Sequence, residues 1–261
     1  MSTPRPAKTN ASSPVALVTG GGRRVGLGIA QALAARGYRL ALHASGSIEA
    51  AERAAAQFTA AGCEAIAASA DLRDADATKA MIEQAAAHFG RIDALVNNAA
   101  IWESKPLDEV TPEDVRKHFE INTLGTFVCA QQAGLLMCAQ AGGGAIVNIG
   151  DWAIERPYPD HAAYFIAKGS IPTLTRTLAV ELGLRNPRVR VNAVLPGPIL
   201  MPEGTSPDEQ RRVIDATLVK RWGTVEELAD AVWLLLSNSF ITGVCLPVDG
   251  GRSVYGPTES D

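Results

Sequence analysis

An acid, a phenol and an amine stand close together in one stretch of the sequence, Asp151 to Lys168. Tyr164 and Lys168 are four residues apart, so on a helix they share one face, with about 5–6 Å between their Cβ atoms. An opposite charge within about 4–6 Å lowers the pKa of an acid by roughly 1–3 units. The spacing therefore predicts a tyrosine that exchanges a proton near neutral pH, as a general acid or base does. Because the same spacing occurs on ordinary amphipathic helices, the rest of the chain has to show whether Tyr164 and Lys168 are catalytic.

A cofactor for such chemistry needs a binding element, and the start of the chain offers a glycine-rich turn. Val15–Val18 is a short apolar run that stops at the turn Thr19–Gly22, and an apolar-periodic segment begins at Arg24. This order indicates a strand, a turn and a helix. Glycines let backbone N–H groups approach a phosphate, which the positive end of the following helix also favours. We expect a dinucleotide site here rather than only a tight connection.

Together these stretches resemble the short-chain dehydrogenase/reductase family. The resemblance covers about Pro14 to Gly256. Its further matches, in the family's order, are Asp71-Leu72 after a third strand, Asn97-Asn98-Ala99-Ala100 after a fourth, Asn122 in the next helix, and Pro196-Gly197 after a sixth. The resemblance implies that Tyr164 is the catalytic acid or base and that Lys168 binds the nicotinamide ribose and assists the tyrosine. It also implies that Asn122 helps to hold a proton-relay water.

The second strand suggests which dinucleotide is bound. No Asp or Glu occurs in Leu42–Ser47, where an NAD site presents an acidic side chain to the ribose 2′-hydroxyl. Arg23 and Arg24, with nearby serines, suit the negative 2′-phosphate, so we expect NADPH. The plainer interpretation, two solvent-facing arginines at a helix start, stays open. The expected cofactor residues are Thr19, Gly20, Gly22, Arg23, Arg24, Val25, Gly26, His43, Ser45, Ser47, Asp71, Leu72, Asn98, Ala99, Ala100, Tyr164, Lys168, Pro196, Gly197 and Ile199.

The alternation of strand-like and helical patterns predicts an α/β fold: one Rossmann-type doubly wound parallel sheet of about seven strands with helices on both faces. Strands are expected at 15–19, 39–44, 64–69, 92–96, 144–150, 188–194 and 243–248, and helices at 24–36, 47–61, 76–89, 111–139, 161–184 and 225–237. Pro172 predicts a bend within a single helix, 163–182. We expect a disordered N-terminal tail at 1–13, one domain at 14–256 and a C-terminal tail at 257–261.

Composition limits the partners. A net charge of −4 without a basic run argues against nucleic acid, so the partner should be a small molecule. No apolar stretch approaches about 18 residues, and residues 1–13 lack an apolar core, which argues against a membrane span and a signal peptide. The four cysteines lack the C-x-x-C spacing of a metal site and indicate buried thiols in a reducing cytoplasm. We expect no metal, a cytoplasmic location and, from the family resemblance, a homotetramer.

Position 151, thirteen residues before Tyr164, holds aspartate where most of the family has serine. Serine donates a hydrogen bond to a substrate carbonyl, whereas an ionised aspartate cannot donate and repels negative charge that develops there. Asp151 can instead accept from N–H groups or share a proton with Tyr164. This suits an electron-poor nitrogen heterocycle better than a ketone. An aspartate that only caps a turn or pairs with Arg156 is the plainer alternative.

These features resemble one subgroup of the family, the pteridine reductases and dihydromonapterin reductases, in Asp151, the Thr-Gly-x-x-x-Arg-x-Gly turn and Pro196–Glu203. In that subgroup the pterin stacks between the nicotinamide and an aromatic residue at the position of Trp102. Two departures are Ala100, where many members have serine, and Gly46, where an arginine often touches the 2′-phosphate. The expected substrate-binding residues are Trp102, Asp151, Tyr164 and Met201.

The sequence thus favours an NADPH-dependent oxidoreductase that reduces a C=N bond of a dihydropterin-like or dihydrofolate-like compound, with Tyr164 as the acid. The alternative is an NADPH-dependent ketone or carbonyl reductase in which Asp151 carries a proton and donates as the missing serine would. Turnover of simple ketones separates the two. A non-catalytic NADP-sensing protein is less expected, because Tyr164, Lys168 and Asn122 are all intact.

Overall fold

Seven parallel strands form one sheet in the computed structural model, which describes residues 5–46, 48–201 and 204–256. The strand order is β3-β2-β1-β4-β5-β6-β7, so the chain winds outwards in both directions from β1 and β4. The predicted doubly wound fold is confirmed. The strands are β1 (Val15–Thr19), β2 (Arg39–Ala44), β3 (Ala65–Ser69), β4 (Ala94–Asn97), β5 (Gly144–Ile149), β6 (Val189–Pro196) and β7 (Cys245–Val248).

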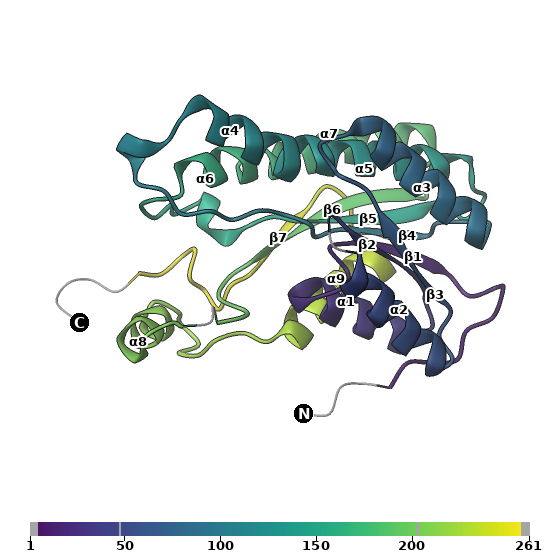
Figure 1. The fold of residues 1–261 in the computed structure, drawn as a ribbon, viewed down its shortest axis with the longest axis horizontal. Coiled ribbons are helices and arrows are strands. Elements are labelled where there is room, and N and C mark those ends of the chain that lie inside the picture. Colours follow the sequence, from purple (N-terminus) through teal and green to yellow (C-terminus); the bar gives the residue numbers. More distant parts are fainter. Residues whose placement is uncertain (1–4, 47, 202–203, 257–261) are drawn as a thin grey trace.

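Helices cover both faces of the sheet (Figure 1). The helices on one face are α1 (Arg24–Ala35), α2 (Glu49–Ala60) and α9 (Val225–Ser237), and those on the other are α3 (Ala75–Phe89), α5 (Gly125–Ala139) and α7 (Ile171–Arg185). Alternate strand residues point to opposite faces, so Ala16 and Val18 pack in the first core and Val15 and Leu17 in the second. A strand buried on both faces is apolar throughout, which explains the continuous apolar run at β1.

The two longest expected helices are interrupted. The segment expected at 111–139 consists of α4 (Pro112–Phe119), a π-helix (Glu120–Leu124) and α5. The segment expected at 161–184 consists of α6 (Ala162–Lys168) and α7, with Pro172 in the first turn of α7. Gly169 (φ −61°, ψ −20°) and Ser170 (φ −76°, ψ −22°) keep right-handed helical dihedrals. The chain therefore stays helical in backbone conformation where proline breaks the hydrogen-bond pattern.

Two further segments were not foreseen. Helix α8 (Pro207–Asp215) lies apart from the two helical layers (Figure 1). Residues 5–13 are not a disordered tail, because Ala7 N–H donates to Ala34 O and Thr9 N–H to Gly62 O, both at 3.0 Å. These bonds fasten the segment to the ends of α1 and α2. Ser47 and the C-terminal tail 257–261 lie outside the described residues.

The structure also bears on the expected thiols, membrane spans and metal sites. All four cysteines are free. Cys63 and Cys129 are buried, whereas Cys138 and Cys245 are only partly buried. Burial raises the pKa of the Cys129 thiol to about 12, which makes it unreactive. Among the helices in the described ranges, none is long and apolar enough to cross a membrane. The described part of the chain also brings together no group of three His, Cys, Asp or Glu side chains that would hold a metal ion.

Candidate active site

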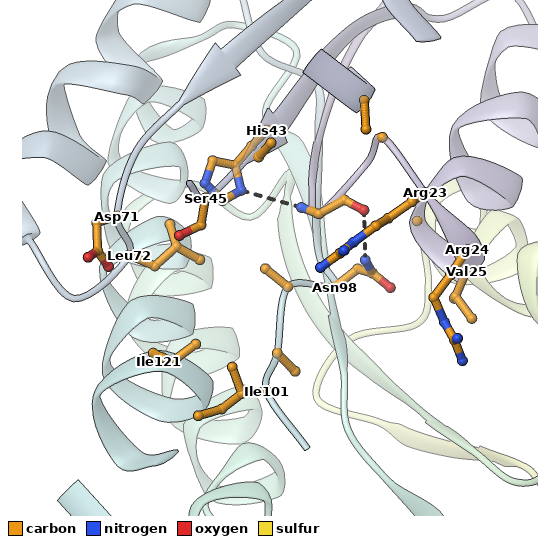
Figure 2. Close-up of a pocket in the computed structure, with 17 residues that line it drawn as sticks. Arg23, Arg24, Val25, His43, Ser45, Asp71, Leu72, Asn98, Ile101 and Ile121 are labelled. Atoms are coloured by element: carbon orange, nitrogen blue, oxygen red, sulfur yellow. Dashed lines mark hydrogen bonds between the residues drawn. The ribbon is translucent and has the colours of Figure 1, made fainter. Parts of the chain in front are cut away.

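Two adjoining cavities open at the carboxyl ends of the strands, where open α/β sheets bind ligands. The first, of about 450 Å³, lies between the loops that follow β1, β2, β3 and β4 (Figure 2). The second, of about 940 Å³, lies over β5, β6 and α6. Both are lined by Arg24, Val25, Asn98 and Ala100, so they meet there. The first occupies the point where the strand order reverses, between β1 and β4.

The expected cofactor residues divide between the two cavities. Those that line the first are Gly20, Gly22, Arg23, Arg24, Val25, Gly26, His43, Ser45, Asp71, Leu72, Asn98, Ala99 and Ala100. Those that line only the second are Tyr164, Lys168, Pro196, Gly197 and Ile199. Thr19 lies beneath the first cavity rather than on its wall. A dinucleotide with its adenine half in the first cavity and its nicotinamide half in the second would touch both sets.

A reciprocal clamp fixes the floor of the first cavity. Thr19 Oγ1 accepts from the backbone N–H groups of Asn98 at 2.9 Å and Ala99 at 3.0 Å, while Asn98 Nδ2 donates to Thr19 O at 2.9 Å. Gly20 has φ +63°, which favours glycine. A Cβ at Gly26 would lie 2.1 Å from the carbonyl oxygen of Gly20. The conformation at Gly20 and the close packing at Gly26 therefore both disfavour a side chain.

The buried side chain of His43, on β2, is hydrogen-bonded to this turn. Its ring is fully buried, Gly20 N–H donates to Nδ1 at 3.3 Å, and Nε2 lies 3.0 Å from the carbonyl oxygen of Ala70 (Figure 2). An Nδ1 that accepts and an Nε2 that donates define the neutral tautomer with the proton on Nε2. Burial lowers the pKa of His43 below its usual 6.5, which keeps the ring neutral. The histidine thus joins the turn to the end of β3.

Two arginines border the first cavity without a carboxylate partner. In the described part of the chain, neither Arg23 nor Arg24 forms an ion pair or a side-chain hydrogen bond, and both are exposed. Figure 2 shows Arg23 directed towards the side on which Ser45 lies and Arg24 directed away from it. Arg24 also has φ +49°, which is uncommon for a residue other than glycine. Free guanidinium groups beside a glycine turn fit the phosphates of a dinucleotide.

Asp71 is engaged with a neighbour. Its carboxylate accepts from Arg73, with the ion pair at 2.5 Å, and these hydrogen bonds lower the pKa of Asp71. The predicted cofactor contact of Asp71 therefore competes with Arg73. Leu72 beside it is buried and supplies an apolar wall.

Tyr164 and Asp151 meet in the second cavity. The Tyr164 hydroxyl donates to Asp151 Oδ2 at 2.7 Å, and Asp151 Oδ1 accepts from Ala153 N–H at 2.8 Å. Asp151 thus caps the 3₁₀ turn Trp152–Ile154 and also binds the phenol. Arg156 is not its partner, because the Arg156 guanidinium donates to the carbonyl oxygens of Arg252 and Tyr255.

The pKa of Tyr164 moves in the direction opposite to our prediction. Tyr164 is buried, and burial first and the negative charge of Asp151 second raise its pKa well above 10.0. Lys168 does not counteract this, because its Nζ donates to Ile149 O at 2.7 Å. Burial also lowers the pKa of Lys168 itself to about 8, although the charge of Asp151 opposes this. The phenol is therefore held in its protonated, proton-donating form.

Asn122 lies in the π-helix between α4 and α5. Its Nδ2 donates to Ile101 O and its Oδ1 accepts from Ile101 N–H, both at 2.9 Å. The Asn122 side chain therefore holds the loop after β4 in place. The backbone carbonyl of Asn122 accepts from Thr126 Oγ1 at 2.9 Å. One-turn π-helices often occur at functional sites. This one places the Asn122 amide against Ile101, but the side chain is fully buried and lines neither cavity. The relay water that the resemblance implies stays a prediction.

The second cavity has an aromatic wall. The Trp102 ring stacks on His161, with centroids 4.6 Å apart and planes at 21°, and its Nε1 donates to Tyr158 OH at 3.3 Å. Met201 is exposed and does not line this cavity. Sequence reasoning missed Trp152, Tyr158, His161, Trp222 and Arg252, which do line it. The first three were detectable as an aromatic cluster beside Tyr164, whereas the last two come from segments with no local signal.

Comparisons with known proteins agree with this geometry. Residues 22–253 match a family model described as enoyl-(acyl carrier protein) reductase. Versicolorin reductase 1 of Aspergillus parasiticus is 36% identical over 253 residues, covering 91% of this chain and 95% of that protein. The 3-oxoacyl-(acyl-carrier-protein) reductase of Staphylococcus aureus is 35% identical over 240 residues, covering 90% and 96%. A blue fluorescent protein from a metagenomic library, crystallised with NADPH, superposes with a TM-score of 0.83 at 32% identity, covering 92% and 97%.

Proposed function

This chain belongs to the short-chain dehydrogenase/reductase family of oxidoreductases, and we propose that it is an NADPH-dependent carbonyl reductase with Tyr164 as its proton donor. The observation that carries the proposal is the buried Tyr164 phenol, which faces a cavity of about 940 Å³ beside the glycine turn. A relative named as a 3-oxoacyl reductase supports a carbonyl substrate rather than the pterin that the sequence favoured.

The chemistry follows from the protonation state of the phenol. Reduction of a carbonyl needs a hydride at carbon and a proton at oxygen. NADPH, when bound, supplies the hydride. A raised pKa keeps Tyr164 protonated at neutral pH, so the hydroxyl is ready to turn from Asp151 to the carbonyl oxygen and release its proton there. The resulting phenolate then recovers a proton from solvent.

The preference for NADPH is supported by the cations at the first cavity. Arg23 points towards Ser45, at the end of β2, where the sequence has no acidic residue (Figure 2). We therefore assign the 2′-phosphate contact to Arg23 and a position between the two cavities to Arg24. A solved neighbour in complex with NADPH supports the choice of cofactor.

A second candidate is the pterin C=N reduction, and Asp151 favours it. Its carboxylate already accepts two hydrogen bonds, from Tyr164 and from the backbone of Ala153, so it behaves as an acceptor facing an aromatic cavity. Acceptors suit the N–H groups of a pterin, whereas a ketone needs a donor. The two candidates therefore make opposite demands on one side chain.

One experiment separates the candidates. NADPH oxidation is measured with aromatic ketones, a 3-oxoacyl thioester, dihydrobiopterin and dihydrofolate, using wild type and Asp151→Ser. Carbonyl reduction predicts turnover of a ketone or thioester, which rises in Asp151→Ser because serine supplies a donor. Pterin reduction predicts turnover of a dihydropterin, which falls in the variant. If Tyr164→Phe turns over every substrate as wild type does, the proposed acid is wrong.

We also propose the homotetramer implied by the family, on the strength of apolar side chains left exposed on α7, Val180 and Leu184. Tyr164 sits on α6, directly before this helix, so assembly would steady the site. Light scattering after gel filtration measures the mass of the assembly. A cytoplasmic location is proposed from the free cysteines.

A further inference from the structure

The segment after β7 brings an arginine into the wall of the second cavity. Arg252 Cζ lies 4.5 Å from the centroid of the Trp152 ring, in a cation–π arrangement, and both residues line the cavity with Asp151 and Tyr164. Arg252 is a hundred residues from Trp152 in the sequence. Within the described residues, its guanidinium forms no hydrogen bond and no ion pair.

A partly buried guanidinium without a partner is unusual, and a second arginine of the chain shows what is normal. Among the described residues Arg190 also has no carboxylate partner, but its guanidinium donates to the carbonyl oxygens of Leu235, Leu236 and Ile241. Arg252 has no such acceptors in the part of the chain that the structure describes. Burial lowers the pKa of Arg252, so its charge is partly stripped of water. Desolvating a cation is costly unless something pairs with it.

The acidic groups around Arg252 are used elsewhere. Asp249 accepts from the backbone N–H groups of Gly251 at 2.9 Å and Ser253 at 2.6 Å, which shapes the turn that carries Arg252. Asp151 binds Tyr164, and Glu209 of α8 lines the cavity without pairing with Arg252. The neighbouring cation, Arg156, adds to the positive charge. The cavity therefore presents an anchored, unpaired cation within the same space as the proton donor.

We propose that Arg252 binds a carboxylate of the substrate, so that this reductase prefers flat aromatic keto acids. A guanidinium over an indole face keeps the N–H donors of its edge available, and its planar fork matches a carboxylate in bidentate geometry. Trp102, which is 52% exposed, adds an aromatic surface for the ring of the substrate. The inference rests on the proposed carbonyl reductase function and names its substrate class.

The test compares charged and neutral forms of the same ketones. The substrates are 3-acetylbenzoate and 4-acetylbenzoate with their methyl esters, and the enzymes are wild type, Arg252→Gln, Arg252→Lys and Arg156→Gln. The last is a matched control, because Arg156 holds the same segment through the carbonyl oxygens of Arg252 and Tyr255 but does not line the cavity. Unchanged NADPH affinity and melting temperature establish that each variant is folded.

For Arg252→Gln we expect kcat/KM to fall about tenfold or more with whichever acetylbenzoate is the better substrate of the wild type. The value for the methyl ester of that acid should change less than about twofold. Arg252→Lys should recover part of the loss because it keeps the charge. Arg156→Gln should change the ratio of acid to ester far less than Arg252→Gln does, because Arg156 does not line the cavity and acts on a carboxylate there only from a distance. If acid and ester fall equally in Arg252→Gln, or neither falls, the proposed carboxylate contact is wrong.

A second readout separates this inference from the proposed function. Binding of each acetylbenzoate to the NADP⁺ complex is followed by quenching of tryptophan fluorescence, since Trp102 and Trp152 line the cavity. Should wild type reduce no ketone, the carbonyl reductase function fails, but the carboxylate contact is still decided. A tenfold weaker binding of the acids to Arg252→Gln supports the contact, and equal binding to both proteins overturns it.

Discussion

The two cavities are built in different ways. The first cavity, which we propose as the cofactor site and call the cofactor cavity, rests on one short turn, Thr19–Gly26. Glycines and hydrogen bonds to Asn98 and His43 set the shape of this turn. The second cavity, which we propose as the substrate site and call the substrate cavity, is lined by side chains from segments far apart in the sequence, such as Trp102, Tyr158 and Arg252. The comparison teaches that a site made of backbone leaves a readable spacing in the sequence, whereas a site made of side chains appears only when the fold assembles it.

Their electrostatics differ as well. The cofactor cavity is bordered by Arg23 and Arg24, two cations without an ion pair among the described residues, which suit an anionic ligand. The substrate cavity holds a phenol bonded to a carboxylate, with the cation of Lys168 bonded to a carbonyl oxygen. Changes in the first cavity should therefore alter cofactor affinity, and changes in the second should alter the chemical step.

The largest effect is expected from Tyr164→Phe, which tests whether chemistry belongs to the substrate cavity alone. Loss of a general acid lowers kcat by roughly 10²–10⁴-fold. The affinity for NADPH should stay within about twofold, as measured by fluorescence titration. Tyr158→Phe is the control, since the Tyr158 hydroxyl accepts from Trp102 and is not the proton donor. A Tyr164→Phe enzyme that keeps more than a tenth of its kcat would contradict the assignment.

The next effect tests whether the cofactor cavity depends on backbone packing. Gly26→Ala places a Cβ 2.1 Å from Gly20 O, so the turn has to shift. Overpacking costs about 1–3 kcal/mol of folding stability. A displaced turn that loses about 1 kcal/mol of hydrogen bonding to the phosphates would raise the Kd for NADPH roughly fivefold. Gly142→Ala is the matched control, because its Cβ would meet only Arg91, at 3.8 Å. Equal NADPH affinity in both variants would mean that the turn is not the binding element.

A more selective effect distinguishes the two arginines. Arg23→Ala should raise the KM for NADPH about tenfold and leave that for NADH nearly unchanged, because a charge-assisted contact with the 2′-phosphate is lost. Arg24→Ala should change both cofactors alike, since Arg24 lines both cavities. Steady-state kinetics with each cofactor provide the measurement. If Arg24→Ala is the selective variant, the 2′-phosphate lies on the other side of the turn.

The smallest effect concerns the histidine beneath the turn. The pKa of buried His43 is lowered from 6.5, so the unfolded chain binds a proton at a higher pH than the folded chain does. The stabilisation is present above pH 6.5 and is lost as the pH falls below it, by up to about 1.4 kcal/mol per pH unit. Urea unfolding at pH 7.5 and 5.5 should show a smaller difference in His43→Asn than in wild type. His88→Asn, at an exposed site, should behave as wild type.

The sequence predicted the doubly wound parallel sheet and the glycine turn between β1 and α1, because both depend on local patterns: apolar runs, glycines and spacing. The pairing of Asp151 with Tyr164 was one of the roles foreseen for that carboxylate. The raised pKa of Tyr164 was not foreseen, because it depends on burial and on where Lys168 points. Arg252 was also missed, since nothing near it in the sequence shows that β7 delivers it beside Trp152.

The most direct test of the central claim follows the hydride itself. NADPH deuterated at C4 of the nicotinamide is incubated with the enzyme and an equimolar mixture of an aromatic ketone and dihydrobiopterin, and the products are analysed by mass spectrometry. Carbonyl reduction with Tyr164 as the acid predicts an alcohol with one deuterium on its carbinol carbon, and no such product in Tyr164→Phe. Deuterium found only in the pterin ring would contradict the proposed function.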